Sequence, residues 1–283
     1  MRVKQVIIDK DVFRGENTAE LCAFAGSHFL ILPDVLYYEC VTANEKREEL
    51  LDRFREVILA GGCICASRNT IIQKEAKDLS PYGPLVDMQE IRAVRQTFKE
   101  NSRPYNSKAV KAVYKNELGM AQMIMDLADG FTEKLASEQP GLLTEIRKCD
   151  NSKAGRFERL VQRAQFVDSQ DIHSASKRLL KGITEFPEEY CLSDDWVSWH
   201  FLRLILIQSM ERTFLRQKGD ASGIIPIEHD LQDITYVMLL SRADGLLTRD
   251  NKLVKPLAKA AFSEKHVFSD LNEVPQKWAG YWS

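Results

Sequence analysis

Short apolar runs near both ends of the chain alternate with longer segments of helical periodicity. VKQVII at 3–8 and HFLIL at 28–32 are rich in branched apolar residues and are typical of buried strands. Similar runs return as ADGLLT at 243–248 and KHVFSD at 265–270. Because helix-period stretches separate these runs, the pattern predicts one parallel sheet to which both ends of the chain contribute.

Two helices are predicted within the first 62 residues. Asn17 and Thr18 are capping residues in front of TAELCAFAG, a short helical segment that Gly26 ends. Pro33 opens a long helical stretch that runs to Gly61 and Gly62, with a break expected near Thr42. The N-terminal order is therefore strand, helix, strand, helix.

The middle of the chain has helical periodicity and no convincing strand. Its helix-period segments lie at 108–135, 152–166, 170–183 and 195–217. The last of these is apolar nearly all round, which predicts a central buried helix. We therefore expect residues 1–66 and 224–283 to form a discontinuous α/β domain, and residues 67–223 to form a large all-helical insertion.

Composition and charge narrow the class without naming an activity. The 283 residues are 44% hydrophobic and 28% charged, which is typical of an ordinary globular protein. The start lacks a signal-type apolar region, and no apolar run approaches a bilayer span, so we expect a cytoplasmic protein without a membrane segment. The six scattered cysteines are expected to be reduced and mostly buried. A net charge of −2 means that any polyanion must be met by a local basic face.

Four acidic residues lie where an open parallel sheet gathers its ligands. Asp9 ends the first strand, and Glu39 lies on the helix after the second strand. Asp233 begins the helix DITYVMLLSRA, and Asp250 closes the turn after GLLT. An oxygen-only donor set favours hard divalent cations, so the expected cofactor is Mg²⁺ or Mn²⁺, as one or two ions.

Three segments resemble the PIN-domain nucleases. IIDKDVF resembles the opening strand with its first catalytic aspartate, and LPDVLYYEC resembles the segment with the family's glutamate. HDLQDITYVMLLSRADGLLTRDNKL resembles the closing helix, strand and T-x-D turn, so the match covers about residues 1–60 and 224–270. The resemblance implies a PIN-like open parallel sheet flanked by helices, and it implies catalytic, metal-binding roles for the four acids.

Three further residues have supporting roles in this hypothesis. The resemblance implies that Thr248 steadies the last turn. Asp11 stands where the family often has asparagine, and it is either an added ligand or a turn residue. Asp230, three residues before Asp233, is the competing acid for the metal. The helical insertion is far longer than in compact members of the family.

Two basic stripes of the insertion are candidates for nucleic-acid binding. Lys108, Lys111 and Lys115 recur at helical spacing, with Tyr105 and Tyr114 nearby for stacking on bases. The second stripe is on the segment 152–166 and consists of Arg156, Arg159 and Arg163. The alternative for either stripe is an ordinary solvated helix surface.

The favoured function is hydrolysis of phosphodiester bonds by a metal-dependent endoribonuclease that is comparable with toxin-like or defence-type enzymes, with RNA favoured over DNA as the substrate. A structure-selective DNA nuclease would use the same acidic chemistry. A non-catalytic PIN-like nucleic-acid-binding or scaffold protein is the alternative from another class, and the presence of all four acids counts against it. The insertion could also dock a protein partner.

Overall fold

The computed structural model describes residues 3–101, 103–138, 152–217 and 227–280. Five parallel strands form one sheet in the order β3-β2-β1-β4-β5. The strands are β1 Gln5–Ile8, β2 Phe29–Leu32, β3 Cys63–Ile64, β4 Gly245–Leu247 and β5 His266–Phe268. The two ends of the chain thus share one sheet with β1 at its centre, as predicted. β3 was not predicted, because two residues are too short to show a period.

The pairing of β1 with β4 joins residues far apart in the sequence. Val6 lies opposite Gly245 and Ile8 lies opposite Leu247 in parallel register. The three residues Val6, Ile7 and Ile8 are fully buried, as expected for a parallel strand that is covered on both faces. The carboxyl ends of β1 and β4 therefore lie side by side.

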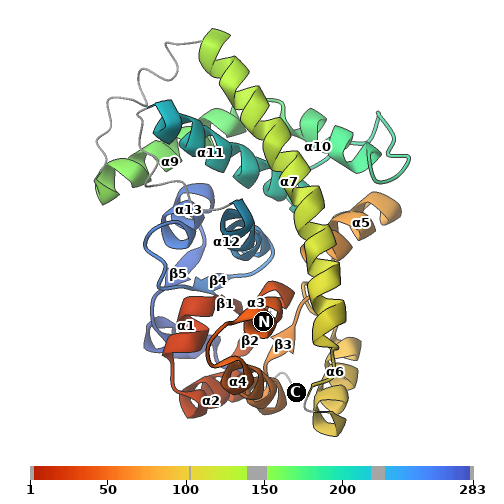
Figure 1. Ribbon diagram of the computed structural model, residues 1–283, viewed down its shortest axis with the longest axis vertical. Helices are drawn as coiled ribbons and strands as arrows, with labels where there is room; N and C mark the ends of the chain where they lie inside the picture. The colour runs from red at the N-terminus through yellow and green to blue at the C-terminus, as the bar shows by residue number, and fades with distance from the viewer. Residues whose placement is uncertain (1–2, 102, 139–151, 218–226, 281–283) are drawn as a thin grey trace.

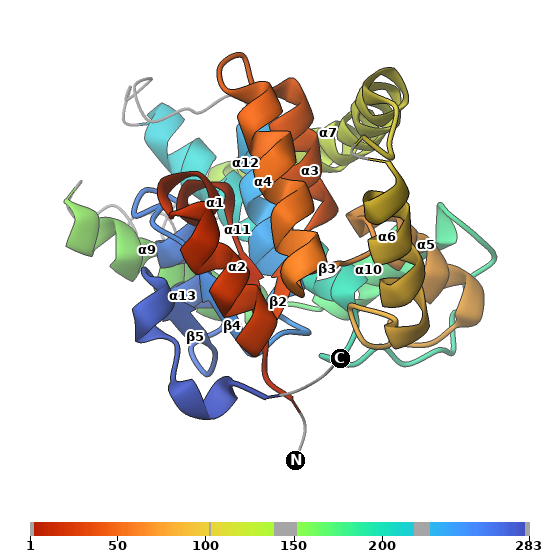
Figure 2. The ribbon, with the colours of Figure 1, turned by 90° about the horizontal axis from the view of Figure 1, so that it is seen from below.

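Helices cover both faces of the sheet (Figures 1 and 2). They are α1 Lys10–Gly15, α2 Thr18–Ser27, α3 Asp34–Thr42, α4 Arg47–Ala60, α12 Ile227–Leu239 and α13 Val254–Ala261. Figure 1 shows α12 and α13 on the side toward the helical block, and α2 and α4 on the opposite side. The break expected near Thr42 is confirmed by the end of α3 and the left-handed Lys46 that precedes α4. Two short 3₁₀ turns, Leu271–Glu273 and Gln276–Trp278, follow β5.

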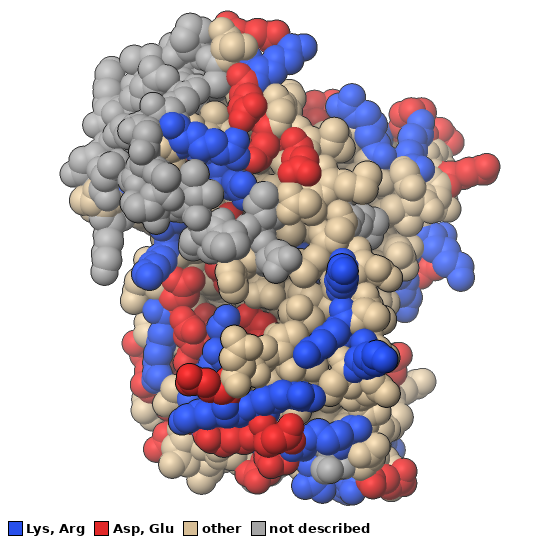
Figure 3. All heavy atoms as spheres, in the orientation of Figure 1, with Lys and Arg blue, Asp and Glu red and all other residues tan. Residues whose placement is uncertain are grey.

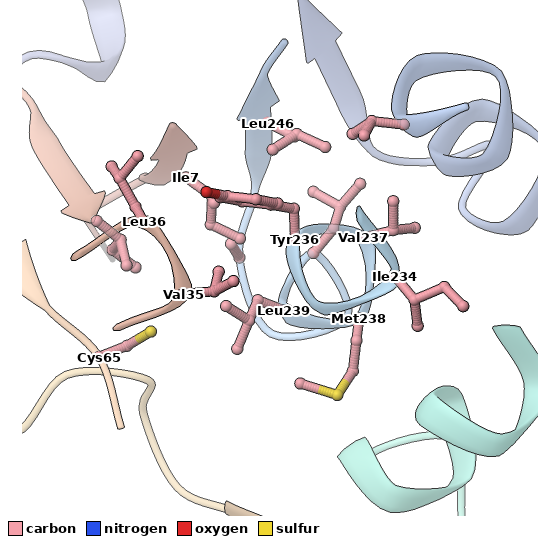
Figure 4. Close-up of a cluster of buried hydrophobic side chains, with 14 of the residues drawn as sticks. Ile7, Val35, Leu36, Cys65, Ile234, Tyr236, Val237, Met238, Leu239 and Leu246 are labelled. Carbon is pink, nitrogen blue, oxygen red and sulfur yellow. The ribbon is translucent and has the colours of Figure 1, made fainter. Parts of the chain in front are cut away.

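The core of the sheet domain lies between α12, α3 and the central strands (Figure 4). α12 packs directly on β1. Its residues Tyr236, Val237 and Leu239 are buried against Ile7 and Leu246. Burying each such side chain contributes roughly 1.5–3 kcal/mol relative to exposure. This packing fixes the height of α12 against the strand ends, which places its polar residues at the edge of the sheet.

The remaining helices lie beside the sheet domain, and most of them form a block at one side of it (Figure 1). They are α5 Arg68–Asp78, α6 Met88–Glu100, α7 Ser107–Glu138, α9 Lys153–Asp168, α10 Ile172–Lys181 and α11 Val197–Gln217. α11 contacts α7, α9, α10 and α12 and is buried along almost its whole length, which confirms the predicted central buried helix. Residues 67–101, 103–138 and 152–217 contain no strand. The expected domain boundary at 223/224 lies outside the described residues.

Two further expectations concern membrane segments and thiols. Within the described ranges, no helix combines the length and the apolar character that crossing a bilayer requires. Cys40, Cys63 and Cys65 are buried free thiols, and Cys22 and Cys191 are free and more accessible. The sixth cysteine, Cys149, lies outside the described residues.

Candidate functional site

A small cavity of about 130 Å³ opens at the carboxyl ends of β1 and β4. All four predicted acids line it: Asp9, Glu39, Asp233 and Asp250. Asp11, Lys10, His229 and Tyr236 also line this cavity. In Figure 3, acidic side chains gather at the left, in the region of α1, and lysine and arginine side chains border them. The acids therefore converge from four separate elements.

Asp9 and Asp250 are held by the turns in which they lie. The Asp9 N–H donates to the Leu247 carbonyl at 3.0 Å, which continues the β1–β4 pairing by one bond. Asp9 Oδ1 accepts from the Val12 N–H at 3.1 Å and so caps α1. Asp250 Oδ1 accepts from the Lys252 N–H at 2.6 Å. Both side chains are thus fixed at adjacent strand ends by local backbone donors.

Thr248 connects these two acids. Its hydroxyl accepts the Asp250 N–H at 3.1 Å, and it also forms a hydrogen bond with Asp9. Its side chain is fully buried. The hydroxyl therefore links the turn after β4 to the end of β1.

Glu39 lies on α3 with only 5% of its surface exposed, and both of its carboxylate oxygens have donors. Lys10 Nζ donates to Oε1 at 2.7 Å, and the Tyr236 hydroxyl donates to Oε2 at 2.6 Å. Burial alone would lower the pKa of Lys10, but the Glu39 carboxylate outweighs it and raises that pKa. Lys10 therefore stays an ammonium group, and it is a cation inside the acidic cavity.

The environment of Asp9 and Asp233 disfavours the charged form of each carboxyl group. Burial raises the pKa of Asp9 to about 7, with smaller contributions from Asp11 and Asp250 and an opposing hydrogen bond from Thr248. Burial, followed by repulsion from Asp250 and Glu39, raises the pKa of Asp233 well above its ordinary value. Desolvated carboxylates that repel one another gain from a nearby positive charge. The cavity therefore favours the uptake of protons or of cations.

The carboxylates are turned toward donors within the chain. Among the described residues, no set of three or more histidine, cysteine, aspartate or glutamate side chains is placed to hold a metal ion. Lys10 and Tyr236 donate hydrogen bonds to the carboxylate of Glu39, while backbone N–H groups donate to the carboxylates of Asp9 and Asp250. The residues supply the oxygen donors that Mg²⁺ and Mn²⁺ prefer, and Lys10 occupies one of the two Glu39 oxygens.

The sequence placed Asp233 at the start of its helix, and this was wrong. α12 begins at Ile227, so Asp233 lies in its second turn. The apolar period becomes regular only from Leu231, and polar residues such as His229 are acceptable in a first turn. Because Asp233 faces the cavity from within a helix, its position is set by the packing of α12 on β1.

Asp230 does not line the cavity. It is 1% exposed, and its Oδ2 accepts from Gln208 Nε2 at 3.2 Å and lies 3.5 Å from Arg212 Nη1. Burial raises its pKa, while Gln208 and Arg212 lower it. Asp230 thus faces α11, and Asp233 is the aspartate of α12 that lines the cavity. Asp11 lies on the rim as an exposed residue of α1.

In the structure, the three lysines of the first stripe are exposed, but only one of the two nearby tyrosines is. Lys108, Lys111 and Lys115 are exposed on α7. Tyr105 is 40% exposed, whereas Tyr114 is buried and stacks on Tyr38 with ring centroids 3.5 Å apart. Tyr114 is therefore unavailable for stacking on a base.

The arginine stripe is not a solvent-exposed surface. Arg159 and Arg163 are 2% and 0% exposed and both pair with Glu211 of α11, which is 1% exposed. Arg156 is the accessible member, with 25% of its side chain exposed. Burial and repulsion from Arg159 lower the pKa of Arg156, while Asp250 and Asp230 raise it. Helical spacing correctly grouped the three residues, but the face they share packs on α11.

Lys10 and Tyr236, which bind Glu39 in the cavity, were missed from the sequence. Lys10 follows Asp9 directly, and Tyr236 lies three residues after Asp233, so both are neighbours of predicted acids. The spacing of Asp233 and Tyr236 by three residues would have placed them on one helical face. The contact of Lys10 with Glu39 joins residues 29 apart and has no local signal.

A comparison of the chain with models of known families, with curated proteins and with solved structures returns no match. The resemblance to PIN-domain nucleases therefore stays a hypothesis that rests on the sequence motifs.

Asp9→Asn should stabilise the metal-free protein in a pH-dependent way. The pKa of Asp9 is raised from 3.8 to about 7 in the fold, so between these values the folded chain holds a proton that the unfolded chain has released. Stability therefore falls as pH rises through this window, and the penalty is complete above it. The neutral amide avoids the penalty and keeps an oxygen to cap α1. In EDTA, the gain in unfolding free energy should grow from about pH 4 to about pH 7, to on the order of 3 kcal/mol.

Chemical denaturation at several pH values measures this gain. Asp87→Asn, which changes an exposed N-cap acid of α6, controls for the loss of a capping carboxylate. A gain that is the same at pH 5 and pH 8 would contradict the buried, repelled state of Asp9.

Glu211→Gln should destabilise the protein far more than Arg156→Gln. The first change leaves Arg159 and Arg163 buried without a carboxylate, and breaking a buried ion pair in this way costs about 3–5 kcal/mol. Arg156 is a quarter exposed and lies 3.9 Å from Glu211, so its loss should cost less than about 1 kcal/mol. Urea unfolding of the two variants compares these effects. Equal losses would mean that Glu211 is hydrated and that the three arginines are equivalent.

Proposed function

We propose that the protein is a metal-dependent nuclease of the PIN type that hydrolyses phosphodiester bonds, with RNA as the favoured substrate. One observation carries the proposal: four acids from β1, α3, α12 and the turn after β4 line a single cavity at the carboxyl edge of a parallel sheet. Ligands of open parallel sheets bind at this edge.

The electrostatics of the cavity support a role for a divalent cation. Burial first, and neighbouring carboxylates second, raise the pKa values of Asp9 and Asp233, so both charged forms would be stabilised by a nearby cation. Asp9, Glu39, Asp233 and Asp250 would hold Mg²⁺ or Mn²⁺. The bound ion would supply a water of lowered pKa and would stabilise charge on the phosphoryl oxygens.

Other residues of the chain would orient Glu39 and bind the phosphate groups. Glu39 is oriented by Tyr236, which is 2% exposed and anchors one of its oxygens. Lys10, once it is released from Glu39, would present an ammonium group to a non-bridging phosphate oxygen at the cavity. Arg156 is close enough to Asp250 and Asp230 for their carboxylates to raise its pKa. Its guanidinium group would contact the phosphate backbone beside the cavity.

A non-catalytic nucleic-acid-binding protein is the second candidate, and one observation favours it. Lys10 already neutralises Glu39, so part of the negative charge is balanced without any added cation. Under this alternative the ion pair of Lys10 with Glu39 has a structural role only, and the nucleic acid would bind only at the basic surfaces. Cleavage and metal binding separate the two candidates.

Cleavage should require a divalent cation and Asp233. The protein is incubated with labelled single-stranded RNA, duplex RNA, single-stranded DNA and branched DNA in Mg²⁺, Mn²⁺ or EDTA. We expect RNA products with Mn²⁺ or Mg²⁺ and none with EDTA. Asp233→Asn and Asp9→Asn should each reduce the rate at least about 100-fold, because each removes a ligand of the ion that activates water.

The matched control is Asp270→Asn, an acid after β5 that lies outside the cavity and is 42% exposed. Its rate should stay within a factor of two of the parent's, roughly the change that loss of a distant surface charge produces. Products confined to branched DNA would change the substrate class and keep the mechanism. Absence of cleavage on every substrate in both metals would leave the non-catalytic candidate.

Lys10→Met should tighten the binding of Mn²⁺. The ammonium group 2.7 Å from Glu39 competes with a cation for that carboxylate, so removing it should lower the dissociation constant for Mn²⁺ about tenfold. The metal-free variant should be less stable, because Glu39 loses its partner. Calorimetric titration with Mn²⁺ and thermal unfolding with and without Mn²⁺ measure both effects.

Lys4→Met is the matched control for a lost ion pair. Lys4 pairs with Asp244 at 2.7 Å beside the amino end of β1, away from the cavity. Its loss should leave the affinity for Mn²⁺ unchanged. Equal affinities of all three proteins would show that Lys10 does not compete with an ion.

A further inference from the structure

The long helix α7 carries a row of exposed apolar side chains. Val113, Met123, Leu127 and Phe131 are 59%, 67%, 74% and 56% exposed. They make up four of the seven large hydrophobic residues that are exposed in the described part of the chain. Single exposed apolar residues are ordinary, but a concentration of them on one element marks an interaction surface.

These side chains form one stripe along the helix. At about 100° per residue, the four positions fall within about 80° of the helix circumference. Met123, Leu127 and Phe131 follow one another at intervals of four residues, which places them on adjacent turns. Tyr114, Ala121 and Ala128 are buried on another side, where α7 packs on α11 and α3. The apolar stripe therefore faces away from the body of the protein.

Charge is distributed unevenly beside this stripe. The exposed charges of the N-terminal half of α7 are Lys108, Lys111 and Lys115, and in the described part of the chain none of them forms an ion pair. The C-terminal half exposes Asp126 and Glu133, and it also exposes Lys134 and Glu138, which pair with each other at 3.8 Å. By the same helical geometry, the three lysines, Asp126 and Glu133 lie on one flank of the stripe, whereas the pair Lys134–Glu138 continues the line of the stripe beyond Phe131. Figure 3 shows blue at the lower, N-terminal part of α7, and mostly red with some blue toward its upper end.

We propose that this stripe binds the same stripe of a second copy of the chain, with the two α7 helices antiparallel. In an antiparallel pair, each flank meets the identical flank of the other helix in reverse. The basic half of one copy then lies against the acidic half of the other. A single register serves both ends: when Lys115 faces Asp126 of the second copy, Lys108 faces Glu133 of the second copy.

Other arrangements use these features less completely. A parallel pair would place lysine halves together and acidic halves together, which is repulsive. A nucleic acid would use the lysines but would gain little from Met123 or Leu127 and would be repelled by Asp126. Antiparallel self-association uses the apolar row and both signs of charge. It is independent of the proposed nuclease activity, because α7 contributes no residue to the acidic cavity.

The first test is the oligomeric state of the full chain. Sedimentation equilibrium from low to high micromolar concentration should show a monomer–dimer equilibrium. Leu127→Glu buries a charge in the proposed interface and should raise the dissociation constant at least about 100-fold. Met88→Glu is the matched control, since Met88 is 51% exposed on α6; it should leave the constant unchanged. Circular dichroism checks that each variant is folded.

The second test uses charge reversal to fix the orientation. Glu133 also pairs with Arg216 of its own chain, so Lys115 and Asp126 are the better pair. Lys115→Glu and Asp126→Lys should each weaken the dimer about tenfold or more, because like charges then face each other twice. The double variant with both changes should recover the parental constant, and an equimolar mixture of the two single variants should form a heterodimer.

Each contrary result overturns part or all of the proposal. A monomer at every concentration removes it, and a dimer that is insensitive to Leu127→Glu places the interface elsewhere. Failure of the double variant to recover removes the antiparallel register. Loss of RNA binding by Lys115→Glu in a chain that stays monomeric would assign the lysine row to nucleic acid. Because cleavage is not a readout here, failure of the nuclease proposal would leave these results unaffected.

Discussion

The parallel pairing of β1 with β4 is the constraint on which the rest of the structure depends. It joins Val6 to Gly245 and Ile8 to Leu247, and the next backbone bond, from Asp9 to Leu247, continues the same ladder. A parallel pair requires a connection that returns to the same end of the sheet. Here the connection includes β2, β3 and the helical block. The acidic cavity exists only because this pairing places the ends of two distant strands side by side.

Once the strand ends meet, electrostatics decides the details of the cavity. Asp9 and Asp233 are desolvated among other carboxylates, and their pKa values rise in response. The fold offsets part of this cost with Lys10, whose ammonium group binds Glu39. The same contact keeps the metal-free cavity intact and occupies an oxygen that an ion would use. Under the proposed function, folding and metal binding would thus compete for one carboxylate, which is a form of the trade between stability and function.

The helical block also buries charged side chains, and here the charges are paired. Arg159 and Arg163 are enclosed with Glu211 between α9 and α11. The spacing that put the arginines on one face is identical for a buried and an exposed face, because periodicity reports direction around the helix and not what covers it. On α7 the contrast is reversed: apolar residues such as Leu127 remain exposed. In both helices the surrounding elements, and not the local pattern, decide which residues meet solvent.

The sequence alone determined the features that depend on local order. Apolar runs identified four of the five strands, and periodicity identified the buried α11, because both signals arise from neighbouring residues. The order of motifs selected Asp9, Glu39, Asp233 and Asp250, which do line one cavity. Only the tertiary structure decided the ion pair of Lys10 with Glu39, the burial of Arg163 and the exposure of the α7 stripe. These depend on contacts between residues far apart in the chain, whose free energy is set by the solvent and charge that the folded neighbours leave to each group.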